Sequence, residues 1–518
     1  MQKHFKKIRL VLALVFFAAF LVSFADFRGN MPSRWHSAIL YLQFVPSVIK
    51  FFTPLAVLSL GFIVVLLLTL LAGRVYCSTI CPLGVLQDFF IHIRLKWMPK
   101  KGLRFKQAHR VLRYSVLVLA LISLLFTGVL VFNLLDPYAL FGRMAANLYQ
   151  PALGWTNNII AKLIPASTLH AVKINTLHLA SVSFAGGSLA LLIYLSMAYE
   201  RLYCNSICPV GTFLGLLSKI SLFKLKINPS SCTQCGKCQS VCKSNCINIK
   251  NMHIDESRCV NCFNCIPICS ENSITYKKSA IGLAKKPVTS SDGGRRLFLA
   301  TTTAFLAAKA LPVFAVNENK SEEEHEDKIC FFSRGPIAPP GAIGIDHLKS
   351  SCVACHLCIA VCPTKVLQPS FLEYGFTGMN LPKMDFAVNY CNYECRKCGE
   401  VCPTGAIVKL EKEQKKLTQV GKVVLRMNKC IVETEATACG SCSEHCPTQA
   451  VKMVPYYNGL PAPEIDPSIC IGCGACEYAC PVTDPHPAIF VAANTLHVLA
   501  EKPKQEALET VVEEEFPF

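Results

Sequence analysis

The chain has 518 residues, 52% of them hydrophobic, with 30 cysteines and a formal net charge of +18. Its length exceeds what one hydrophobic core organises, so three or more units are expected, and its hydrophobic fraction predicts several membrane spans. The cysteines recur at fixed short spacings, which excludes a small secreted disulfide protein. The basic residues gather beside apolar runs, which argues against a nucleic-acid partner.

Four apolar runs approach the roughly 20 residues that cross a bilayer. They are the run up to Phe24, Pro54–Ala72, Tyr114–Leu135 and His178–Tyr199. We interpret the first as an uncleaved helix rather than a cleaved signal peptide, because further spans follow and no clear cleavage site does. The sequence therefore predicts a four-helix transmembrane domain over residues 1–222.

The charges of the connections set the orientation of these spans. The connection 73–113 carries nine Lys or Arg residues, whereas the connections before and after it carry three each. The positive-inside rule then places the N-terminus, residues 73–113 and the residues after Tyr199 in the cytoplasm. The two other connections are expected on the opposite side of the membrane.

An internal repeat lies at the cytoplasmic ends of the second and fourth spans. Seven of eleven positions are identical between residues 74–84 and 201–211, and both copies contain Cys-x3-Cys-Pro. The halves therefore resemble a duplicated two-helix unit, which brings both cysteine pairs near a common axis. An additional metal centre, redox-active thiols near a quinol and a structural role all stay open for these residues. The set is Cys77, Cys81, Cys204 and Cys208.

Residues 223–280 carry two runs with the Cys-x2-Cys-x2-Cys-x3-Cys spacing of bacterial ferredoxins, in which the fourth cysteine of each run binds the cluster of the other. Zinc is the competing metal, but zinc sites pair cysteines two by two. We therefore predict a cytoplasmic two-cluster α+β domain. One [4Fe-4S] cluster would bind Cys232, Cys235, Cys238 and Cys269, and the other Cys259, Cys262, Cys265 and Cys242.

Residues 281–328 form a polar linker, a segment that starts with Arg295-Arg296 and runs to Val316, and an acidic tether. Two arginines before a mildly apolar run resemble a twin-arginine (Tat) export signal, with an ordinary membrane anchor as the alternative. Iron–sulfur domains are assembled in the cytoplasm and would have to cross the membrane folded, which favours the export signal. The segment is therefore expected to deliver residues 329–518 to the periplasm.

Four further cysteine runs occupy residues 329–518, and each ends in Cys-Pro. An apolar residue follows three of them, at Val366, Ile407 and Val451, where it would pack on a cluster and exclude water. Segments 406–410 and 422–427 alternate like short strands joined by a Lys-rich hairpin tip. We predict a periplasmic four-cluster α+β domain of the bacterial ferredoxin type.

The assignment of cysteines to these motifs accounts for nearly all of them. Six runs of four and the two Cys-x3-Cys-Pro pairs leave only Cys246 and Cys330 unassigned. Six oxidised four-iron clusters, at about −2 each, would also cancel about 12 of the 18 positive charges.

At this point the chain resembles known families. Residues 1–280 resemble the NapH-type membrane ferredoxin proteins of periplasmic nitrate reductase systems and, more loosely, NosR and MauN. Residues 290–518 resemble the exported NapG-type partner, which has four four-iron clusters. The chain thus looks like a fusion of the two.

The pairing in multi-cluster relatives implies that run one shares clusters with run four, and run two with run three. Carried over, the sets are Cys352, Cys355, Cys358 and Cys480; Cys470, Cys473, Cys476 and Cys362; Cys391, Cys395, Cys398 and Cys446; and Cys430, Cys439, Cys442 and Cys402.

The resemblance implies a protein of the bacterial inner membrane that passes electrons from the quinol pool to a periplasmic reductase in anaerobic respiration. It would be a quinol-dehydrogenase-like component rather than a stand-alone catalyst. The alternative is an accessory or maturation factor for a periplasmic metalloenzyme. No group visible in the sequence carries electrons through the bilayer, so a diffusing quinol is expected to be the link.

Two smaller motifs have competing interpretations. Asp136-Pro137-Tyr138 could take quinol protons, although a helix-end turn explains the same residues. Cys352-Val353-Ala354-Cys355-His356 fits a haem-attachment motif, but it lies inside a ferredoxin run, so no haem is expected.

Overall fold

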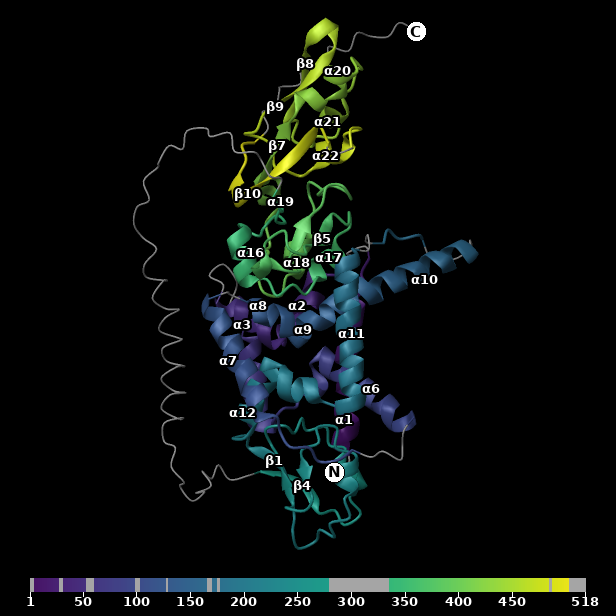
Figure 1. Cartoon of the computed structure of the whole chain (residues 1–518), viewed down its shortest axis with the longest axis vertical. Helices are drawn as coiled ribbons and strands as arrows, with labels where there is room; N and C mark the ends of the chain where they lie inside the picture. The colour runs from purple at the N-terminus through teal and green to yellow at the C-terminus, as the bar shows by residue number, and fades with distance from the viewer. Residues whose placement is uncertain are drawn as a thin grey trace, which may run out of the picture. The chain divides into compact units, whose positions relative to one another are not determined.

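The computed structural model describes residues 4–27, 31–52, 60–97, 103–126, 129–164, 170–174, 178–278, 335–483 and 487–502. The predicted linker, twin-arginine-like segment and acidic tether lie outside these residues, as does Cys330. The described residues before 279 and those after 334 belong to one compact unit. The purple-to-teal part of the chain is helical down to the first strand, and the green-to-yellow part consists of short helices and hairpins (Figure 1).

All four predicted apolar runs are helical where the structure describes them. The helices are α1 (Phe5–Phe24), α4 (Gly61–Ala72), α7 (Arg110–Phe126) with α8 (Leu130–Leu135), and α11 (Leu179–Tyr199). Among the described residues, α1 and α11 alone are long and apolar enough to cross a bilayer. Helices α4 and α7 are shorter, so a domain of four complete spans is not confirmed.

Shorter helices fill the rest of this part of the chain. Proline occupies the first position of three of them, where a missing N–H costs nothing and the fixed φ suits a helix. Their starts follow Cys81, Asp136 and Cys208. The helices are α2 (Ser33–Tyr41), α3 (Phe44–Phe52), α5 (Tyr76–Thr79), α6 (Pro82–Trp97), α9 (Pro137–Met144), the π-helix η2 (Ala145–Tyr149), α10 (Gln150–Leu163), the π-helix η3 (Tyr203–Ile207) and α12 (Pro209–Ser218).

A small α+β domain follows α12. Strand β1 (Phe223–Ile227) pairs antiparallel with β4 (Ile274–Lys278), and β2 (Ile247–Asn248) pairs with β3 (His253–Ile254). The cysteine runs lie in the loops and in two single-turn helices, α13 (Lys237–Ser240) and α14 (Cys265–Ile268). Phe5 at the start of α1 packs on Phe263 with ring centroids 5.6 Å apart. The N-terminal helix therefore contacts this domain.

The C-terminal part repeats the same hairpin design. Strand β5 (Leu367–Pro369) pairs with β6 (Pro382–Met384), β8 (Val451–Pro455) with β9 (Pro461–Ile465), and β7 (Thr418–Leu425) with β10 (Ile489–Leu499), all antiparallel. The helices between them are short: α16 (Ile345–Ser351), α17 (Leu357–Val361), α18 (Lys397–Val401), α19 (Lys412–Leu417), α20 (Ile431–Thr434), α21 (Ser441–Glu444) and α22 (Ala475–Ala479), with 3-10 turns at Phe376–Gly378, Met427–Lys429 and Tyr457–Gly459.

The predicted hairpin between 406–410 and 422–427 is wrong. Residues 406–410 are irregular, and β7 pairs with β10 instead. The Lys-rich segment between them is helix α19, because Glu411 and Gln414 form a capping box that satisfies the first backbone N–H groups.

Candidate metal centres

The two runs before residue 280 form two thiol cages. One cavity of about 350 Å³ is lined by Cys232, Cys235, Cys238 and Cys269. A second, of about 330 Å³, is lined by Cys259, Cys262, Cys265 and Cys242 together with Cys246. The predicted exchange of the fourth cysteine between the two runs is therefore what the structure shows. The hairpin β2–β3 returns the chain between the runs and so brings the two cages together.

Cys246, which the spacing left unassigned, lies inside the second cage. Its Sγ is 3.6 Å from that of Cys242, and the side chain is 1% exposed. The hydrogen bond from Cys246 lowers the pKa of the Cys242 thiol to about 7. No sequence pattern of cluster ligands contains this fifth thiol, so the fold was needed to find it.

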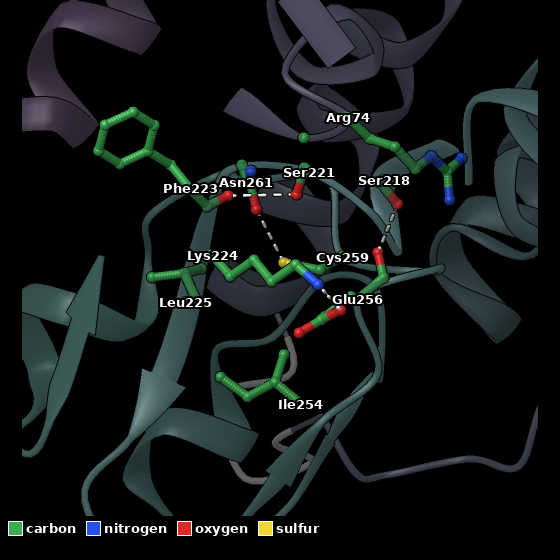
Figure 2. Close-up of a pocket in the computed structure, with 11 residues that line it drawn as sticks. Arg74, Ser218, Ser221, Phe223, Lys224, Leu225, Ile254, Glu256, Cys259 and Asn261 are labelled. Atoms are coloured by element: carbon green, nitrogen blue, oxygen red, sulfur yellow. Dashed lines mark hydrogen bonds and ion pairs between the residues drawn. The ribbon is translucent and has the colours of Figure 1, made fainter. Parts of the chain in front are cut away.

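One cysteine of the second cage, Cys259, lies beside residues of the helical part that include Arg74 and Ser218, as Figure 2 shows. Cys259 borders a pocket of about 250 Å³ that Gly73 and Arg74 line from the other side. The Arg74 Nη1 atom donates to the carbonyl oxygen of Ser257 at 2.9 Å, and the Ser218 hydroxyl donates to that of Glu256 at 2.8 Å. Lys224 pairs with the Glu256 carboxylate at 2.8 Å. The chain just before Cys259 is therefore held by residues from both halves of the helical part, Arg74 and Ser218.

Four more groups of four cysteines lie in the C-terminal part, and two of them line a cavity. One cavity of about 360 Å³ is lined by Cys391, Cys395, Cys398 and Cys362. Another, of about 330 Å³, is lined by Cys430, Cys439, Cys442 and Cys480. Burial, together with the neighbouring thiol of Cys402, raises the pKa of Cys352 and of Cys358. Burial and the nearby Cys446 do the same for Cys470 and Cys476. These contacts define the remaining two groups, Cys352, Cys355, Cys358 and Cys402, and Cys470, Cys473, Cys476 and Cys446.

The predicted pairing of run one with run four and of run two with run three is therefore wrong. Run one exchanges its fourth cysteine with run two, and run three with run four. The reason is local. Hairpin β5–β6 returns the chain between runs one and two, and hairpin β8–β9 does so between runs three and four. Each neighbouring pair thus repeats the arrangement of the two runs before residue 280.

The C-terminal cages follow one another through shared contacts. Cys358 of the first group lies near Cys398 of the second. The backbone N–H of Cys391 donates to the carbonyl oxygen of Cys473 at 2.9 Å, which joins the second group to the fourth. Cys476 of the fourth group lies near Cys442 of the third. The predicted apolar positions Val366, Ile407 and Val451 are each 2% exposed, and Val366 lines a cage, as expected.

The first of these groups packs on helices α9 and α10 and the π-helix between them. Gln150 Nε2 donates to the carbonyl oxygen of Ala360 at 2.9 Å, and Arg143 Nη1 donates to that of Ala354 at 3.4 Å. A Cβ on Gly142 would meet the Cys355 carbonyl oxygen at 2.3 Å. The absence of a side chain at Gly142 therefore allows this close approach.

Both ring nitrogens of His356 have hydrogen-bond partners at the same contact. The Asn147 amide lies 3.0 Å from its Nδ1, and its Nε2 lies 2.9 Å from the carbonyl oxygen of Asn380. Burial lowers the pKa of His356 to about 3, so the ring is neutral at ordinary pH. Both ring nitrogens of His356 therefore have protein partners.

The predicted Asp136-Pro137-Tyr138 motif starts helix α9. Asp136 caps the helix by accepting a hydrogen bond from the Ala139 N–H at 2.9 Å, and Tyr138 packs beside Cys355. Both side chains are 1% exposed. The helix-end interpretation is therefore the one that the structure shows.

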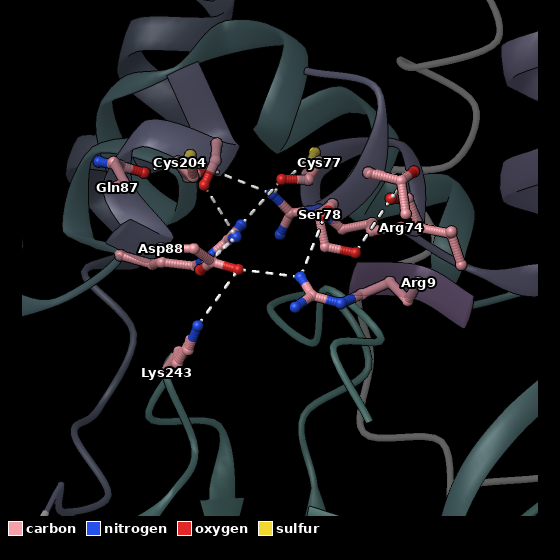
Figure 3. Close-up of polar contacts among 12 residues, drawn as sticks. Arg9, Arg74, Cys77, Ser78, Gln87, Asp88, Cys204 and Lys243 are labelled. Carbon is pink, nitrogen blue, oxygen red and sulfur yellow. Dashed lines mark hydrogen bonds and ion pairs between the residues drawn. The ribbon is translucent and has the colours of Figure 1, made fainter. Parts of the chain in front are cut away.

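The cysteines of the internal repeat also come together. Cys77, Cys81, Cys204 and Cys208 are all buried and free, and they share one core cluster. Beside them lies a carboxylate that the sequence did not single out. Asp88 pairs with Arg201 at 2.7 Å, with Arg9 at 2.9 Å and with Lys243 at 3.3 Å (Figure 3). Burial opposes ionisation of Asp88, but these three cations outweigh it and hold the pKa below its ordinary value.

The donor sets fit iron–sulfur clusters better than single ions. Across the part of the chain that the structure describes, no three Cys, His, Asp or Glu side chains lie close enough together to hold one metal ion. Four thiols around a cavity of more than 300 Å³ instead suit a larger group. Backbone N–H groups also point at sulfur, as at Cys269 (3.3 Å from Ser273 N) and Cys402 (3.4 Å from Ile407 N).

Comparisons with known proteins agree with these donor sets. A family model described as a 4Fe-4S binding domain matches residues 53–101 and 178–228, another of that description matches 225–248, and a 4Fe-4S dicluster domain matches 436–483. No solved structure matches the chain.

Three curated relatives illustrate the range of similarity. The ferredoxin-type protein NapF of Escherichia coli K12 is 25% identical over 28% of this chain and 81% of its own length. The methylamine utilization ferredoxin-type protein MauM of Methylophilus methylotrophus is 28% identical over 29% of this chain and 67% of its own. MauN of Paracoccus denitrificans is 27% identical over 33% of this chain and 49% of its own. The chain is accordingly a ferredoxin-type iron–sulfur protein with several 4Fe-4S domains.

Proposed function

We propose that the protein is a membrane-bound electron carrier that passes electrons from the quinol pool to a periplasmic reductase, as a fusion of a NapH-like and a NapG-like protein. The observation that carries this proposal is that groups of four thiols lie at both ends of the helical part. One set includes the exposed Cys235 in the domain of residues 223–278, and the other ends at the group of Cys430, Cys439, Cys442 and Cys480. An isolated binding module would not need six such groups in one chain.

The surface of the helical part supports insertion in a membrane. Large apolar side chains point outward on four helices, for example Val11 on α1 (60% exposed), Leu67 on α4 (54%), Leu119 on α7 (56%) and Leu191 on α11 (57%). Soluble monomers rarely expose apolar surface on this scale, since water does not solvate it favourably. We therefore assign these faces to lipid, with residues 223–278 in the cytoplasm and 335–502 in the periplasm.

The 24 cysteines of the six runs are proposed to hold six [4Fe-4S] clusters in the groups that the structure defines. Such clusters, when bound, move single electrons, so a row of them divides the two electrons of a quinol. The chain's own contribution is to bury the thiols, direct backbone N–H groups at sulfur and exclude water with residues such as Val366 and Ile407.

Replacing Gly142 with alanine should weaken the contact between the helical part and the first C-terminal cage. The new Cβ would lie 2.3 Å from the Cys355 carbonyl oxygen, which no Cβ tolerates, so the two backbones must separate. We expect slower reduction of the C-terminal clusters by quinol, with unchanged iron content. Gly187→Ala is the matched control, because nothing lies within 4 Å of that position. Equal rates in the two variants would contradict a direct contact at Cys355.

Replacing Cys246 with alanine should leave the second cage loaded but alter its reduction potential. The thiol lies 3.6 Å from the Cys242 sulfur, and hydrogen bonds to ligand sulfur favour the more negative, reduced cluster. Removing this donor should therefore lower the potential in an EPR-monitored redox titration. Cys242→Ala, by contrast, should lose the cluster. Loss of iron in the Cys246 variant would show that Cys246, not Cys242, is the ligand.

The proposed function is tested by mixing the purified protein with a reduced menaquinol analogue and following bleaching of the cluster absorbance. Bleaching supports the quinol role, and its absence removes that role. An accessory or maturation role makes a different prediction in vivo. It predicts a deletion strain whose periplasmic reductase stays inactive with artificial electron donors, whereas an electron carrier predicts full activity with those donors.

A further inference from the structure

The internal repeat places four buried thiols that none of the six ferredoxin cages uses. Cys77, Cys81, Cys204 and Cys208 are 3–4% exposed and free. The second cysteine of each pair precedes a proline and starts a helix, α6 or α12. The Gly211 N–H donates to the Cys208 sulfur at 3.3 Å, and the Gly84 N–H does the same for Cys81. Both sulfurs therefore face a helix N-terminus, where negative charge is favoured.

The two repeats hold one another's cysteine loops. Arg74 of the first repeat donates from Nη2 to the carbonyl oxygen of Cys204 at 3.0 Å. Arg201 of the second repeat donates from Nη1 to the carbonyl oxygen of Cys77, also at 3.0 Å. Both guanidinium groups are buried, at 0% and 1% exposed. These reciprocal bonds fix the two pairs against each other, which a structural role for either pair alone would not require.

The four thiols belong to one buried core cluster. The Arg74 side chain reaches both pairs, because its Nη2 atom lies 3.9 Å from the Cys77 sulfur and 3.0 Å from the Cys204 carbonyl oxygen. Four buried thiols gathered in this way offer a ligand set that iron binds once their protons are released.

A buried amide group beside these thiols also points to a ligand. Gln87 is 0% exposed, and its Oε1 accepts a hydrogen bond from the Cys204 thiol at 2.8 Å (Figure 3). Its Nε2 has no hydrogen-bond partner among the residues that the structure describes. A buried N–H donor without a partner costs about 1–3 kcal/mol. A cluster sulfide or a thiolate ligand beside Gln87 would accept a hydrogen bond from this Nε2 group.

A short series of contacts joins this group to the nearest cage on each side. On one side, Arg201 bonds both the Cys77 carbonyl and Asp88, and Asp88 pairs with Lys243, which directly follows Cys242. On the other side, the Tyr203 hydroxyl donates to the Leu135 carbonyl at 2.8 Å. Helix α9 starts there and carries Tyr138 to the side of Cys355.

We infer that Cys77, Cys81, Cys204 and Cys208 bind a seventh iron–sulfur cluster, which relays electrons between the cage of Cys259 and the cage of Cys355. The family model described as a 4Fe-4S binding domain covers both repeats, yet each repeat has only two cysteines. One cluster shared between the repeats accounts for both facts. The inference rests on the proposed iron–sulfur function for the two neighbouring cages.

The relay step is a single electron transfer without bond making or proton uptake. A cluster held by the cage of Cys259 would lose one electron to a cluster held by Cys77, Cys81, Cys204 and Cys208, and a cluster held by the cage of Cys355 would then accept it. The sequence suggested that only a diffusing quinol links the two sides. The structure instead offers a route within the protein, so that quinol is one entry point rather than the sole connection.

Metal content of the whole protein gives the first test. The wild type should contain about 28 iron atoms and as much labile sulfide, against about 24 without the seventh cluster. Cys81→Ala and Cys208→Ala should each lose only the excess, while Gly187→Ala, at a position with nothing within 4 Å, keeps it. An excess of about four indicates a four-iron cluster and one of about two a two-iron cluster. A wild type with about 24 iron atoms overturns the inference, whether or not the variants fold.

Electron transfer across vesicles gives the second test. The full-length protein is inserted in quinone-free vesicles, with dithionite outside, ferricyanide inside, and valinomycin with potassium to remove the membrane potential. The wild type should reduce the ferricyanide, and the Cys81→Ala variant should lose this activity while its other clusters stay loaded. Unchanged activity in the variant refutes the relay. Because dithionite is the donor, a failure of quinol to reduce the protein leaves this result unaffected.

Discussion

Replacing Asp88 with asparagine should destabilise the helical part by about 3–5 kcal/mol, because it leaves buried cations without a counter-charge. Asp88 pairs with Arg201, Arg9 and Lys243, and the exposed fraction of each of these side chains is 10% or less. It joins the start of α1, the repeat of residues 201–211 and the loop after Cys242. No other single side chain in the described part of the chain pairs with cations from three such distant segments.

The measurement is thermal unfolding of the detergent-solubilised protein, followed by loss of cluster absorbance and by the helical circular dichroism signal. Glu394→Gln is the control, since Glu394 pairs with Lys412 and Lys416 on the surface, where solvent screens ion pairs. We expect the Asp88 variant to unfold at a lower temperature than the wild type, and the control to unfold at the same temperature as the wild type. An unchanged transition in both would mean that the three cations are solvated and that the carboxylate is not the centre of this network.

Replacing Cys402 with alanine should release the cluster bound by run one. In the structure Cys402 completes the group of Cys352, Cys355 and Cys358. A cluster bound by these four thiols would therefore lose its fourth protein ligand. The expected result is loss of about four iron atoms and new reactivity of the three thiols toward N-ethylmaleimide. Tandem mass spectrometry of the labelled peptides identifies which thiols react.

The matched variant is Cys480→Ala, which should expose Cys430, Cys439 and Cys442 and leave run one protected. The pairing implied by multi-cluster relatives predicts the reverse. In that arrangement Cys402→Ala exposes Cys430, Cys439 and Cys442, and Cys480→Ala exposes the thiols of run one. The two labelling patterns share no peptide, so one experiment decides between them.

The sequence predicted the positions of the cages well, because ligand spacing is a local property. The first three cysteines of a run follow one another at short intervals, and in each of four cavities such a trio lines the same cage. The exchange of the fourth cysteine depends on which runs are neighbours in space. Short hairpins such as β5–β6 decide this, and cysteine spacing does not encode them. The pairing therefore had to come from the fold.

The polar groups of the helical part were harder to predict for the same reason. Arg74 and Arg201 belong to the repeat and were visible in the sequence, but their exchange of carbonyl partners at Cys204 and Cys77 appears only when the halves pack. Asp88 has no counterpart in the second repeat, where Gly215 occupies the equivalent position. A comparison of the two repeats therefore does not identify Asp88.

These thiol cages are proposed to hold iron–sulfur clusters in one membrane protein. The most direct measurement is the amount of iron, labile sulfide and zinc per chain in protein purified without oxygen from a membrane fraction. At least about 24 iron atoms, equal sulfide and negligible zinc are predicted. A few iron atoms per chain, or zinc in their place, would contradict the account.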